Sequence, residues 1–259
     1  MIISTASRVN TPLEQKAKQA AKELGFPYVA RRKRSVADLQ KQYESDCLIV
    51  KRERLELYPL HESEPFFFHP NSASFRVKRL MRGEEDPFVS AAKLESGMSV
   101  LDCTLGLASD SIVASFVTGP TGQVTGIEGN PVLGYIVKLG LKEWQAPLPE
   151  LQAAMEKIEV QLGRYQQLLS TFADRSFDVV YFDPMFTETV EASEGIAGLR
   201  HFAIYDELEK ETLEQAMRVA KQRVVLKDHF RSDRFERLGF EQHIRKTSAF
   251  HFGTIEVLC

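Results

Sequence analysis

The sequence predicts an α/β fold: a mostly parallel sheet with helices on both faces, finished by an antiparallel hairpin and preceded by a small α/β unit. From Ser99 onward, short apolar runs alternate with segments of helical periodicity, as in successive strand–helix–strand units. The last two predicted strands, 240–246 and 251–258, are joined by too few residues for a helical crossover, so they must pair antiparallel. The 259 residues are 43% apolar and 27% charged, which is typical of a globular chain and excludes a disordered or fibrous one.

Residues 1–74 are predicted to form a small basic α/β domain, and residues 75–259 the larger domain. In the small domain, Thr11-Pro12 marks the start of a helix that Gly25 ends, and Ser35 caps a second helix that runs to Tyr43. Two paired strands follow, over 47–52 and 55–60, because their apolar residues alternate. An Arg- and Lys-rich linking segment, 75–94, then leads into the larger domain.

The larger domain is predicted to contain five strands and three helices before its terminal hairpin. In chain order they are a strand over 98–105, a helix over 110–117, a strand over 123–128, a helix over 131–144, strands over 157–162 and 177–182, a helix over 206–221 and a strand over 223–227. In a parallel sheet of this kind, ligands bind at the carboxyl ends of the strands. Polar residues at those ends are therefore the candidates for function.

Positive charge is concentrated at the front of the chain. Residues 1–82 hold 16 Lys+Arg against 9 Asp+Glu, a net charge of +7, whereas residues 83–259 hold 17 against 27, a net charge of −10. A basic segment attached to an acidic body favours the interaction of that segment with a polyanion. The alternative is that these Lys and Arg side chains form an ordinary solvated surface.

The sequence predicts a cytoplasmic protein that neither crosses a membrane nor holds a structural metal. No run approaches the roughly 18 apolar residues that a membrane span needs, and the first residues lack the basic flank and apolar stretch of a signal peptide. Cys47, Cys103 and Cys259 are widely spaced, without a Cys-x-x-Cys pair, and the six histidines are scattered. A disulfide framework and a zinc site are therefore not expected.

The first polar strand end lies at Asp102, where the chain turns towards the next helix. Gly106 in this turn would let the backbone approach a ligand closely, and the carboxylate of Asp102 suits a cationic amine. Thr104 and Ala108 stand where a full glycine fingerprint has glycine. An ordinary tight turn between a strand and a helix is therefore the alternative.

The second polar strand end is Glu128, 26 residues after Asp102 and close to the roughly 20 expected between these positions in dinucleotide-binding units. A carboxylate here can accept hydrogen bonds from both ribose hydroxyls of an adenosine-containing cofactor. The alternative is an acid that interacts with the dipole of the helix beginning at Pro131.

The third polar strand end is Asp183-Pro184-Met185-Phe186, directly after a strong apolar strand. An acid beside a proline and close to an aromatic residue can hold an exocyclic amine by hydrogen bonds while the ring stacks on the base. Asp-Pro is also an ordinary turn dipeptide. A fourth polar strand end is Lys227-Asp228-His229. These residues could line the substrate cleft or simply end the strand in solvent, and the sequence favours neither interpretation.

Together these residues resemble class I S-adenosylmethionine-dependent methyltransferases. The pattern Asp-x-Thr-x-Gly-Leu-x-x-Asp at 102–110, then Glu128 and the Asp-Pro-Met-Phe at 183–186, follow that family's order and spacing. More narrowly, the chain resembles the bacterial 16S ribosomal RNA guanine-N2 methyltransferases of the small-subunit type J group. The further matches are Arg82-Gly83-Glu84, Asn130-Pro131-Val132, the strand 223–227 and the small amino-terminal unit.

The resemblance implies a Rossmann-like sheet, S-adenosylmethionine as cofactor, no metal, and ribosomal RNA or the small ribosomal subunit as partner. The cofactor-binding residues it implies are Arg82, Asp102, Thr104, Gly106, Asp110, Glu128, Asn130 and Asp183. Asp183, Pro184 and Phe186 would be catalytic, since they would orient the amine and stack on the base. The residues that would contact phosphates without reading sequence are Arg31, Arg32, Lys33, Arg34, Lys51, Arg52, Arg76, Lys78 and Arg79.

Other functions remain open from the sequence. They are a methyltransferase for a small-molecule or protein amine, a nicotinamide-dependent oxidoreductase, and an inactive relative that binds RNA. The sequence does not specify an oligomeric state. Residues 187–203 contain Gly195 and Gly198 and lie between the supposed catalytic turn and the next helix, so we expect them to form a lid over the base pocket.

Overall fold

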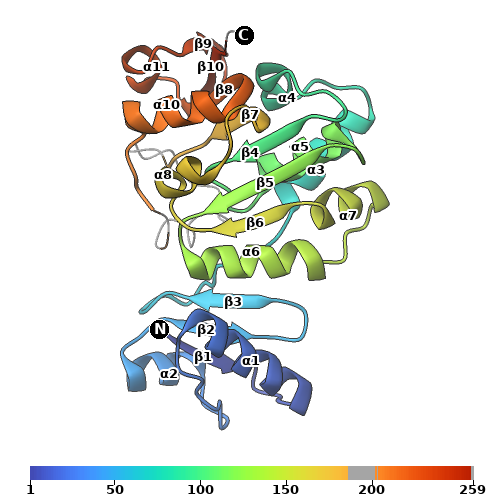
Figure 1. Cartoon of the computed structure of the whole chain (residues 1–259). Helices are drawn as coiled ribbons and strands as arrows, with labels where there is room; N and C mark the ends of the chain where they lie inside the picture. Colours follow the sequence, from blue (N-terminus) through green and yellow to red (C-terminus); the bar gives the residue numbers. More distant parts are fainter. Residues whose placement is uncertain (186–201, 203, 258–259) are drawn as a thin grey trace. The chain divides into compact units, whose positions relative to one another are not determined.

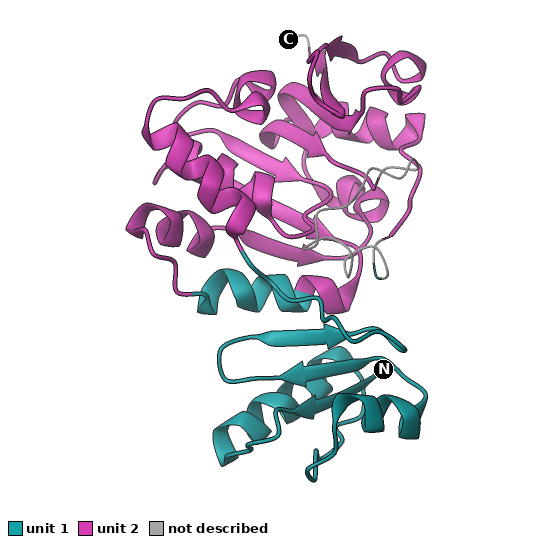
Figure 2. Cartoon of the chain, turned by 180° about the vertical axis from the view of Figure 1, so that it is seen from behind, with its two compact units in different colours: residues 1–69, 135–144, 192–203 teal, residues 70–134, 145–191, 204–259 magenta. Residues whose placement is uncertain are grey.

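The computed structural model describes residues 1–185, 202 and 204–257. The chain divides into two compact units, coloured separately in Figure 2. Unit 1 takes its described residues from 1–69, 135–144 and 192–203, and unit 2 takes its residues from 70–134, 145–191 and 204–259. Across the described part of the chain, no helix has both the length and the apolar character needed to span a membrane.

Unit 1 contains a three-stranded sheet in the order β1-β2-β3 (Figure 1). Its described residues also include the helices α1 and α2 and most of α6 (Pro131–Glu143). The strands are β1 (Ile2–Thr5), β2 (Cys47–Val50) and β3 (Leu55–Tyr58). β1 pairs parallel with β2, and β2 pairs antiparallel with β3, as the sequence predicts for the latter pair. The prediction missed β1, because a four-residue strand at the start of a chain has no flanking turn signal on one side.

Local side-chain bonds fix the start of the first two helices of unit 1. Helix α1 (Thr11–Leu24) is capped by Asn10, whose side chain accepts a bond from the Leu13 N–H, whereas the sequence predicts the cap one residue later, at Thr11. Gly25, at φ +72°, ends the helix in the left-handed conformation that glycine adopts readily. Helix α2 (Val36–Tyr43) begins at the predicted cap, Ser35, which forms a capping box with Asp38.

Unit 2 is built on a seven-stranded sheet in the order β6-β5-β4-β7-β8-β10-β9. The strands are β4 (Ser99–Asp102), β5 (Gln123–Glu128), β6 (Glu159–Leu162), β7 (Phe177–Phe182), β8 (Ala220–His229), β9 (Glu241–His243) and β10 (Phe250–Glu256). β4 to β8 pair in parallel, whereas β10 pairs antiparallel with both β8 and β9. This confirms the predicted parallel sheet with a terminal antiparallel hairpin.

The sequence predicts only three of the eight α-helices that the structure describes after residue 70. The helices after residue 70 are α3 (Asn71–Met81), α4 (Pro87–Ala92), α5 (Ser109–Thr118), α6 (Pro131–Glu143), α7 (Pro149–Glu156), α8 (Tyr165–Leu168), α10 (Lys210–Val219) and α11 (Arg234–Arg237). The predicted linking segment 75–94 is therefore wrong, because it contains most of α3 and all of α4. Ala73 and Val77, four residues apart, form the buried face of α3, and the surrounding Arg and Lys residues obscure this short pattern in the sequence.

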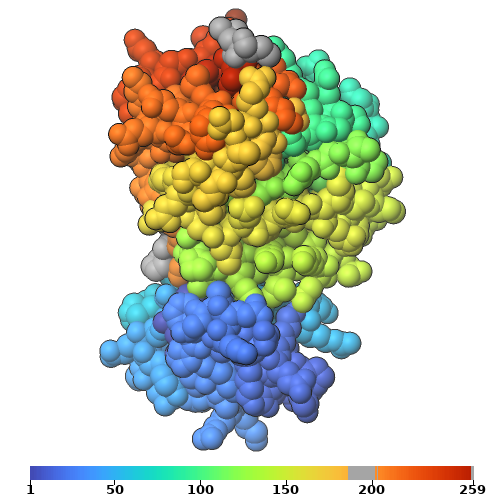
Figure 3. Space-filling view, in the orientation of Figure 1, coloured from blue at the N-terminus to red at the C-terminus, as the bar shows by residue number. Residues whose placement is uncertain are grey.

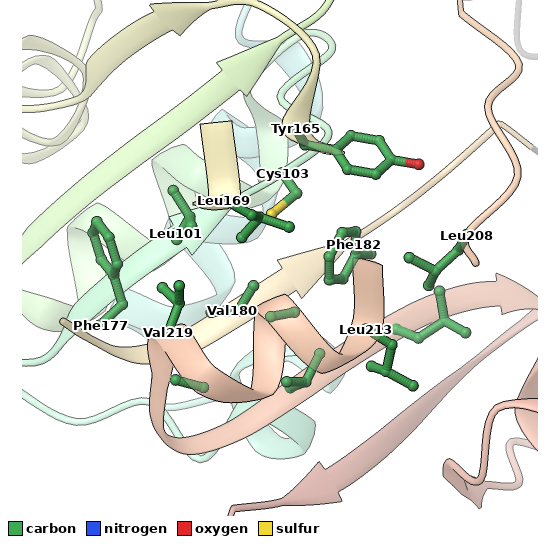
Figure 4. Close-up of a cluster of buried hydrophobic side chains, with 14 of the residues drawn as sticks. Leu101, Cys103, Tyr165, Leu169, Phe177, Val180, Phe182, Leu208, Leu213 and Val219 are labelled. Carbon is green, nitrogen blue, oxygen red and sulfur yellow. The ribbon is translucent and has the colours of Figure 1, made fainter. Parts of the chain in front are cut away.

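One hydrophobic core of unit 2 lies between the sheet and the helices α8 and α10. Figure 4 shows Leu101, Val180 and Phe182 from the sheet facing Leu169 and Leu213 from the helical side. In the space-filling view of Figure 3, the gold surface of the segment that contains α8 adjoins the orange surface of α10. This packing fixes the strands whose carboxyl ends carry the candidate functional residues.

Candidate active site

The candidate site lies where the strand order of the sheet reverses. β4 is followed in sequence by β5 on one side, whereas β7 pairs with it on the other, so the carboxyl ends of β4 and β7 flank a topological switch point. Successive side chains of a strand alternate between its faces. Val180 and Phe182 face the core of α10, and Tyr181 projects to the other face, where its ring lies 4.5 Å from that of Phe88 in α4.

Lys227 is the central cation of this site. Tyr181 pairs with Val225 in the β7–β8 register, so Lys227 lies two residues further along β8 on the same face. Its Nζ is 2.7 Å from Oδ2 of Asp183 and 3.3 Å from Oδ2 of Asp110. Burial alone would lower the pKa of Lys227, but the two carboxylates outweigh it and raise that pKa, so the side chain stays protonated.

A second cation, Arg76 of α3, binds Asp110 from another direction. Its Nη1 lies 2.5 Å from Oδ1 of Asp110, and its Nε and Nη2 form a bidentate pair with Asp86 at 2.7 and 2.8 Å. The hydroxyl of Tyr181 donates to Asp110 over 2.9 Å. Burial opposes ionisation of Asp110, but the charges of Lys227 and Arg76 dominate and lower its pKa.

Asp102 is bound by its own loop and is only 2% exposed. Its Oδ1 accepts a bond from the Thr104 N–H at 3.0 Å, and its Oδ2 accepts one from the Ser111 hydroxyl at 2.6 Å. Burial raises the pKa of Asp102 to about 7, and the charges of Asp110 and Asp183 add to that rise. The side chain therefore shapes the loop between β4 and α5.

This loop is joined directly to the turn after β7. The hydroxyl oxygen of Thr104 accepts a 2.6 Å hydrogen bond from the backbone N–H of Asp183. Asp183 has a side chain that is 26% exposed, and burial raises its pKa to about 6 although Lys227 opposes the rise. Asp183 is thus the one carboxylate of this cluster that combines a firm cationic partner with substantial access from outside.

Glu128 ends β5 and contacts the same loop from the other side. Its Oε2 accepts from the Gly106 N–H at 3.2 Å and its Oε1 from the Asn130 N–H at 2.8 Å, while burial raises its pKa. The side chain of Asn130 accepts bonds from the Val132 and Leu133 N–H groups and so caps α6. The structure therefore brings Asp102, Thr104, Gly106, Glu128 and Asn130 into one region, as the sequence predicts for adjacent strand ends.

The other residues that the sequence predicts for the site lie outside this region, directly after Asp183, or outside the described residues. Arg82 is 63% exposed at its side chain and pairs with Glu84, and Pro184 follows Asp183 directly. Phe186 and the expected lid fall almost entirely outside the described residues, since only Phe202 of 187–203 is described. In unit 1, Arg32, Lys33 and Arg52 are exposed.

Several predicted phosphate contacts are instead bound to the protein itself. Arg31 is 9% exposed and donates to the Arg34 carbonyl, and the Arg34 guanidinium donates back to the Arg31 carbonyl. Lys51 pairs with the buried Glu56. Arg76 lies within the carboxylate cluster, while Lys78 on the same helix is exposed and Arg79 pairs with Glu84.

Sequence reasoning assigned no site role to Tyr181 and left Lys227 undecided. A tyrosine within an apolar strand and a lysine that ends one are both weak signals, because neither reveals its partner. Their partner, Asp110, lies 71 residues before Tyr181 and 117 before Lys227. The available signal is the register: both residues occupy the face and the strand end where the predicted carboxylates gather.

Comparison with known proteins identifies the family of this chain. A protein-family model described as "Putative SAM-dependent methyltransferase" matches residues 32–246, most of the chain. The chain belongs to this methyltransferase family. The uncharacterized protein YpiP of Bacillus subtilis is 48% identical to this methyltransferase over 255 residues, which cover 98% of this chain and 99% of the relative.

More distant relatives of the methyltransferase carry a more specific name. A ribosomal RNA small subunit methyltransferase J from Nitrosococcus oceani is 29% identical over 82% of both chains. Another, from Alteromonas mediterranea, is 27% identical over 78% of this chain and 77% of the relative. A solved SAM-dependent methyltransferase structure from Neisseria gonorrhoeae superposes with a TM-score of 0.65 at 18% identity, over 99% of this chain and 96% of that one, which shows the shared fold.

S-adenosylmethionine is the cofactor of this methyltransferase, and the residues at the strand ends fit it. At Gly106, φ is +49° and the nearest atom to the position of a Cβ is the Thr104 carbonyl oxygen, 3.8 Å away, so a ligand can approach the backbone there. Glu128 is a carboxylate with about four acceptor positions, enough for ribose hydroxyls besides its bonds to Gly106 and Asn130. Among the residues the structure describes, no group of three His, Cys, Asp or Glu side chains could hold a metal ion.

Proposed function

We propose that this methyltransferase transfers a methyl group to an exocyclic amine of a nucleobase in ribosomal RNA, with guanine N2 as the target. The observation that carries the proposal is the environment of Asp183, an accessible carboxylate whose Oδ2 is held at 2.7 Å by a buried lysine at the exit of β7. The relatives named ribosomal RNA small subunit methyltransferase J support the ribosomal substrate.

Glu128 and Gly106 would hold the cofactor, Glu128 through the ribose hydroxyls and Gly106 by leaving space beside its backbone. Asp102 would keep the loop in shape through its bonds to Thr104 and Ser111. When bound, S-adenosylmethionine supplies a methyl group on a positively charged sulfur, which becomes a neutral thioether when the methyl leaves. The protein must therefore mainly align the amine, and alignment of this kind lowers barriers by several kcal/mol.

Asp183 would perform that alignment. Lys227 holds Oδ2, so Oδ1 and the backbone carbonyl before Pro184 are the acceptors that we propose for the two N–H bonds of the amine. Hydrogen bonds to both favour a pyramidal nitrogen, whose lone pair is less delocalised into the ring. As the N–C bond forms, the nitrogen must lose one proton, and the carboxylate of Asp183, with its pKa near 6, can accept it. Lys227 cannot, because it remains protonated.

The test is methyl transfer from radiolabelled S-adenosylmethionine to small ribosomal subunits, and separately to free ribosomal RNA, taken from cells that lack the enzyme. We expect label in RNA, digestion of that RNA to yield N2-methylguanosine, and loss of label with Asp183→Asn. Label in ribosomal protein or in a small metabolite, with none in RNA, would contradict the proposed substrate. Binding of RNA without transfer would instead favour the inactive relative.

A further inference from the structure

An aromatic and cationic surface adjoins the candidate active site at the carboxyl end of β8. His229 pairs directly with Phe250 of β10, so their side chains lie on the face that also carries Lys227. The ammonium of Lys227 lies 5.1 Å from the centre of the Phe250 ring, and Lys227 also holds Asp183. One side chain therefore links the reacting carboxylate to this aromatic surface.

The surface continues outward from this pair as alternating rings and cations. The guanidinium of Arg245 lies 6.0 Å from the Phe250 ring centre. On the other side, the rings of His229 and Phe230 are 4.6 Å apart, and Arg231 lies 5.0 Å over Phe230. Phe230 is 40% exposed, and Arg231 is also exposed. We call these five residues, His229, Phe230, Arg231, Arg245 and Phe250, the hairpin patch.

The charge of this region differs from that of its surroundings. Residues 227–251 hold six Lys+Arg against four Asp+Glu, a net charge of +2, within the part of the chain (83–259) whose net charge is −10. Arg234 and Arg237 of α11 are paired with carboxylates, Asp228 and Glu207 respectively. By contrast, neither Arg231 nor Arg245 forms an ion pair with a carboxylate of the described residues.

We propose that the hairpin patch binds the single-stranded RNA that flanks the nucleotide to be methylated, an inference that rests on the proposed function. Phe230 and Arg231 are exposed, and His229, Arg245 and Phe250 are half-buried beside them. Accessible rings interleaved with arginines suit a single strand, since bases stack on the rings while the cations contact phosphates. The position of the patch beside Lys227 places the flanking nucleotides next to the base held by Asp183. The antiparallel hairpin thus supplies a binding surface for the RNA substrate within the same unit as the catalytic turn.

The test measures binding of a labelled single-stranded RNA of about 12 nucleotides, within the range of known single-strand site sizes, to the full chain over a series of salt concentrations. We expect Phe230→Ala to weaken binding about 10-fold through lost stacking. Arg231→Ala should reduce the slope of log K against log salt by about 0.7, the value for one phosphate contact on a single strand.

Two matched variants control for general effects of truncation. Val9→Ala removes an apolar side chain of similar exposure, 45%, from unit 1, and Arg237→Ala removes an exposed arginine already paired with an acid. Both should leave RNA affinity and salt slope unchanged. Affinity for S-adenosylmethionine should be the same in all four variants, since none of the four residues belongs to the cofactor region.

The outcomes separate this inference from the proposed function. If the wild-type chain methylates ribosomal RNA while Phe230→Ala and Arg231→Ala bind RNA like the wild type, the patch is not an RNA surface and the function stands. If these variants lose binding only to intact small subunits, a protein covers the patch and the inference is overturned. If RNA binding depends on the patch but no methyl reaches RNA, the patch is an RNA-binding surface, but the proposed function falls and with it the placement of that RNA beside a methylated nucleotide.

Discussion

The ammonium of Lys227 lies 2.7 Å from Oδ2 of Asp183 in an environment where its own side chain is only 17% exposed. A buried cation at this distance fixes one carboxylate oxygen in space and favours the ionised form of the acid. Lys227 is therefore a positioning residue: it acts on the substrate through Asp183. Its removal should affect the ionisation of Asp183 as well as the rate.

Lys227→Met should shift the acid limb of the pH–rate profile for methyl transfer to higher pH, by about 1 to 3 units. The reason is that Lys227 lowers the pKa of Asp183, so without it burial and Asp110 raise that pKa above its value of about 6. Lys227→Arg, which keeps the charge, is the control and should retain the limb near its wild-type position. An unshifted limb in a folded Met variant would contradict the assigned role.

Asp102→Asn should change how stability depends on pH. In the wild type, the folded-state pKa of about 7 lies above the ordinary value near 4, so the stabilisation of the protonated form is complete below pH 4 and is lost as pH rises through 7. Asparagine does not titrate, so its contribution to the unfolding free energy stays constant over this pH range. The variant's unfolding free energy relative to wild type should therefore increase by about 1.4 kcal/mol per pH unit between these values. Urea titrations of both proteins from pH 4 to 8 measure these unfolding free energies. If the free energies of wild type and variant changed with pH in parallel, the raised pKa of Asp102 would be refuted.

Arg76→Met should destabilise the protein by about 3–5 kcal/mol, because Asp86 and Asp110 would each lose a buried cationic partner. Lys78→Met, on the exposed side of the same helix, should change the unfolding free energy by no more than about 0.5 kcal/mol. Urea denaturation of both variants measures the difference. Equal, small effects would mean that the carboxylate cluster does not depend on Arg76.

Glu128→Gln should weaken S-adenosylmethionine binding about 10- to 100-fold, the loss expected for hydrogen bonds to a charged acceptor. Glu150→Gln, an exposed acid on α7, should leave the affinity unchanged. Calorimetric titration of wild type and both variants provides the measurement, with NADH as a second ligand that we expect not to bind. Equal affinity of wild type and Glu128→Gln would remove the carboxylate from the cofactor site.

Arg32 and Lys33 form an exposed tip in unit 1, both in the left-handed conformation, at φ 45° and 64°. The turn is closed by a 3.0 Å bond from the Arg34 N–H to the Arg31 carbonyl. Replacing both tip residues by alanine should lower the salt slope of RNA binding by about 1.4 if each contacts one phosphate. An unchanged slope would mean that this tip is simply solvated.

Local chemistry made much of the fold predictable. β5 and β7 begin and end where their apolar runs predict, and Ser35 caps α2 through the short-range bonds that its residue type suggests. The antiparallel hairpin followed from the length of its connection alone. Each of these features depends on residues close together in the chain, so the sequence displays them directly.

The electrostatic partners in the site could not be predicted in the same way. Arg76 lies in an Arg- and Lys-rich segment and has the sequence context of a surface cation, yet its partner Asp110 is 34 residues away and buried. Likewise, Asp102 has the position of an outward-facing ligand, but Thr104 and Ser111 occupy its oxygens. Whether a charged group points outward or pairs inside depends on the packing of α3 and α5, which no local pattern encodes.

The hydrogen bond between the Asp183 N–H and the Thr104 hydroxyl has a consequence for how tightly the enzyme binds its two ligands together. Thr104 belongs to the loop that adjoins the cofactor region, and Asp183 to the turn that we propose receives the acceptor base. This 2.6 Å bond joins the two segments in addition to the 2.9 Å bond from the Cys103 N–H to the Tyr181 carbonyl, so a displacement of one segment should affect the other. The two ligands are then thermodynamically linked: whatever factor the cofactor contributes to acceptor affinity, the acceptor returns to the cofactor. Thr104→Val should reduce this linkage, measured as a smaller effect of the cofactor on the affinity for the acceptor RNA.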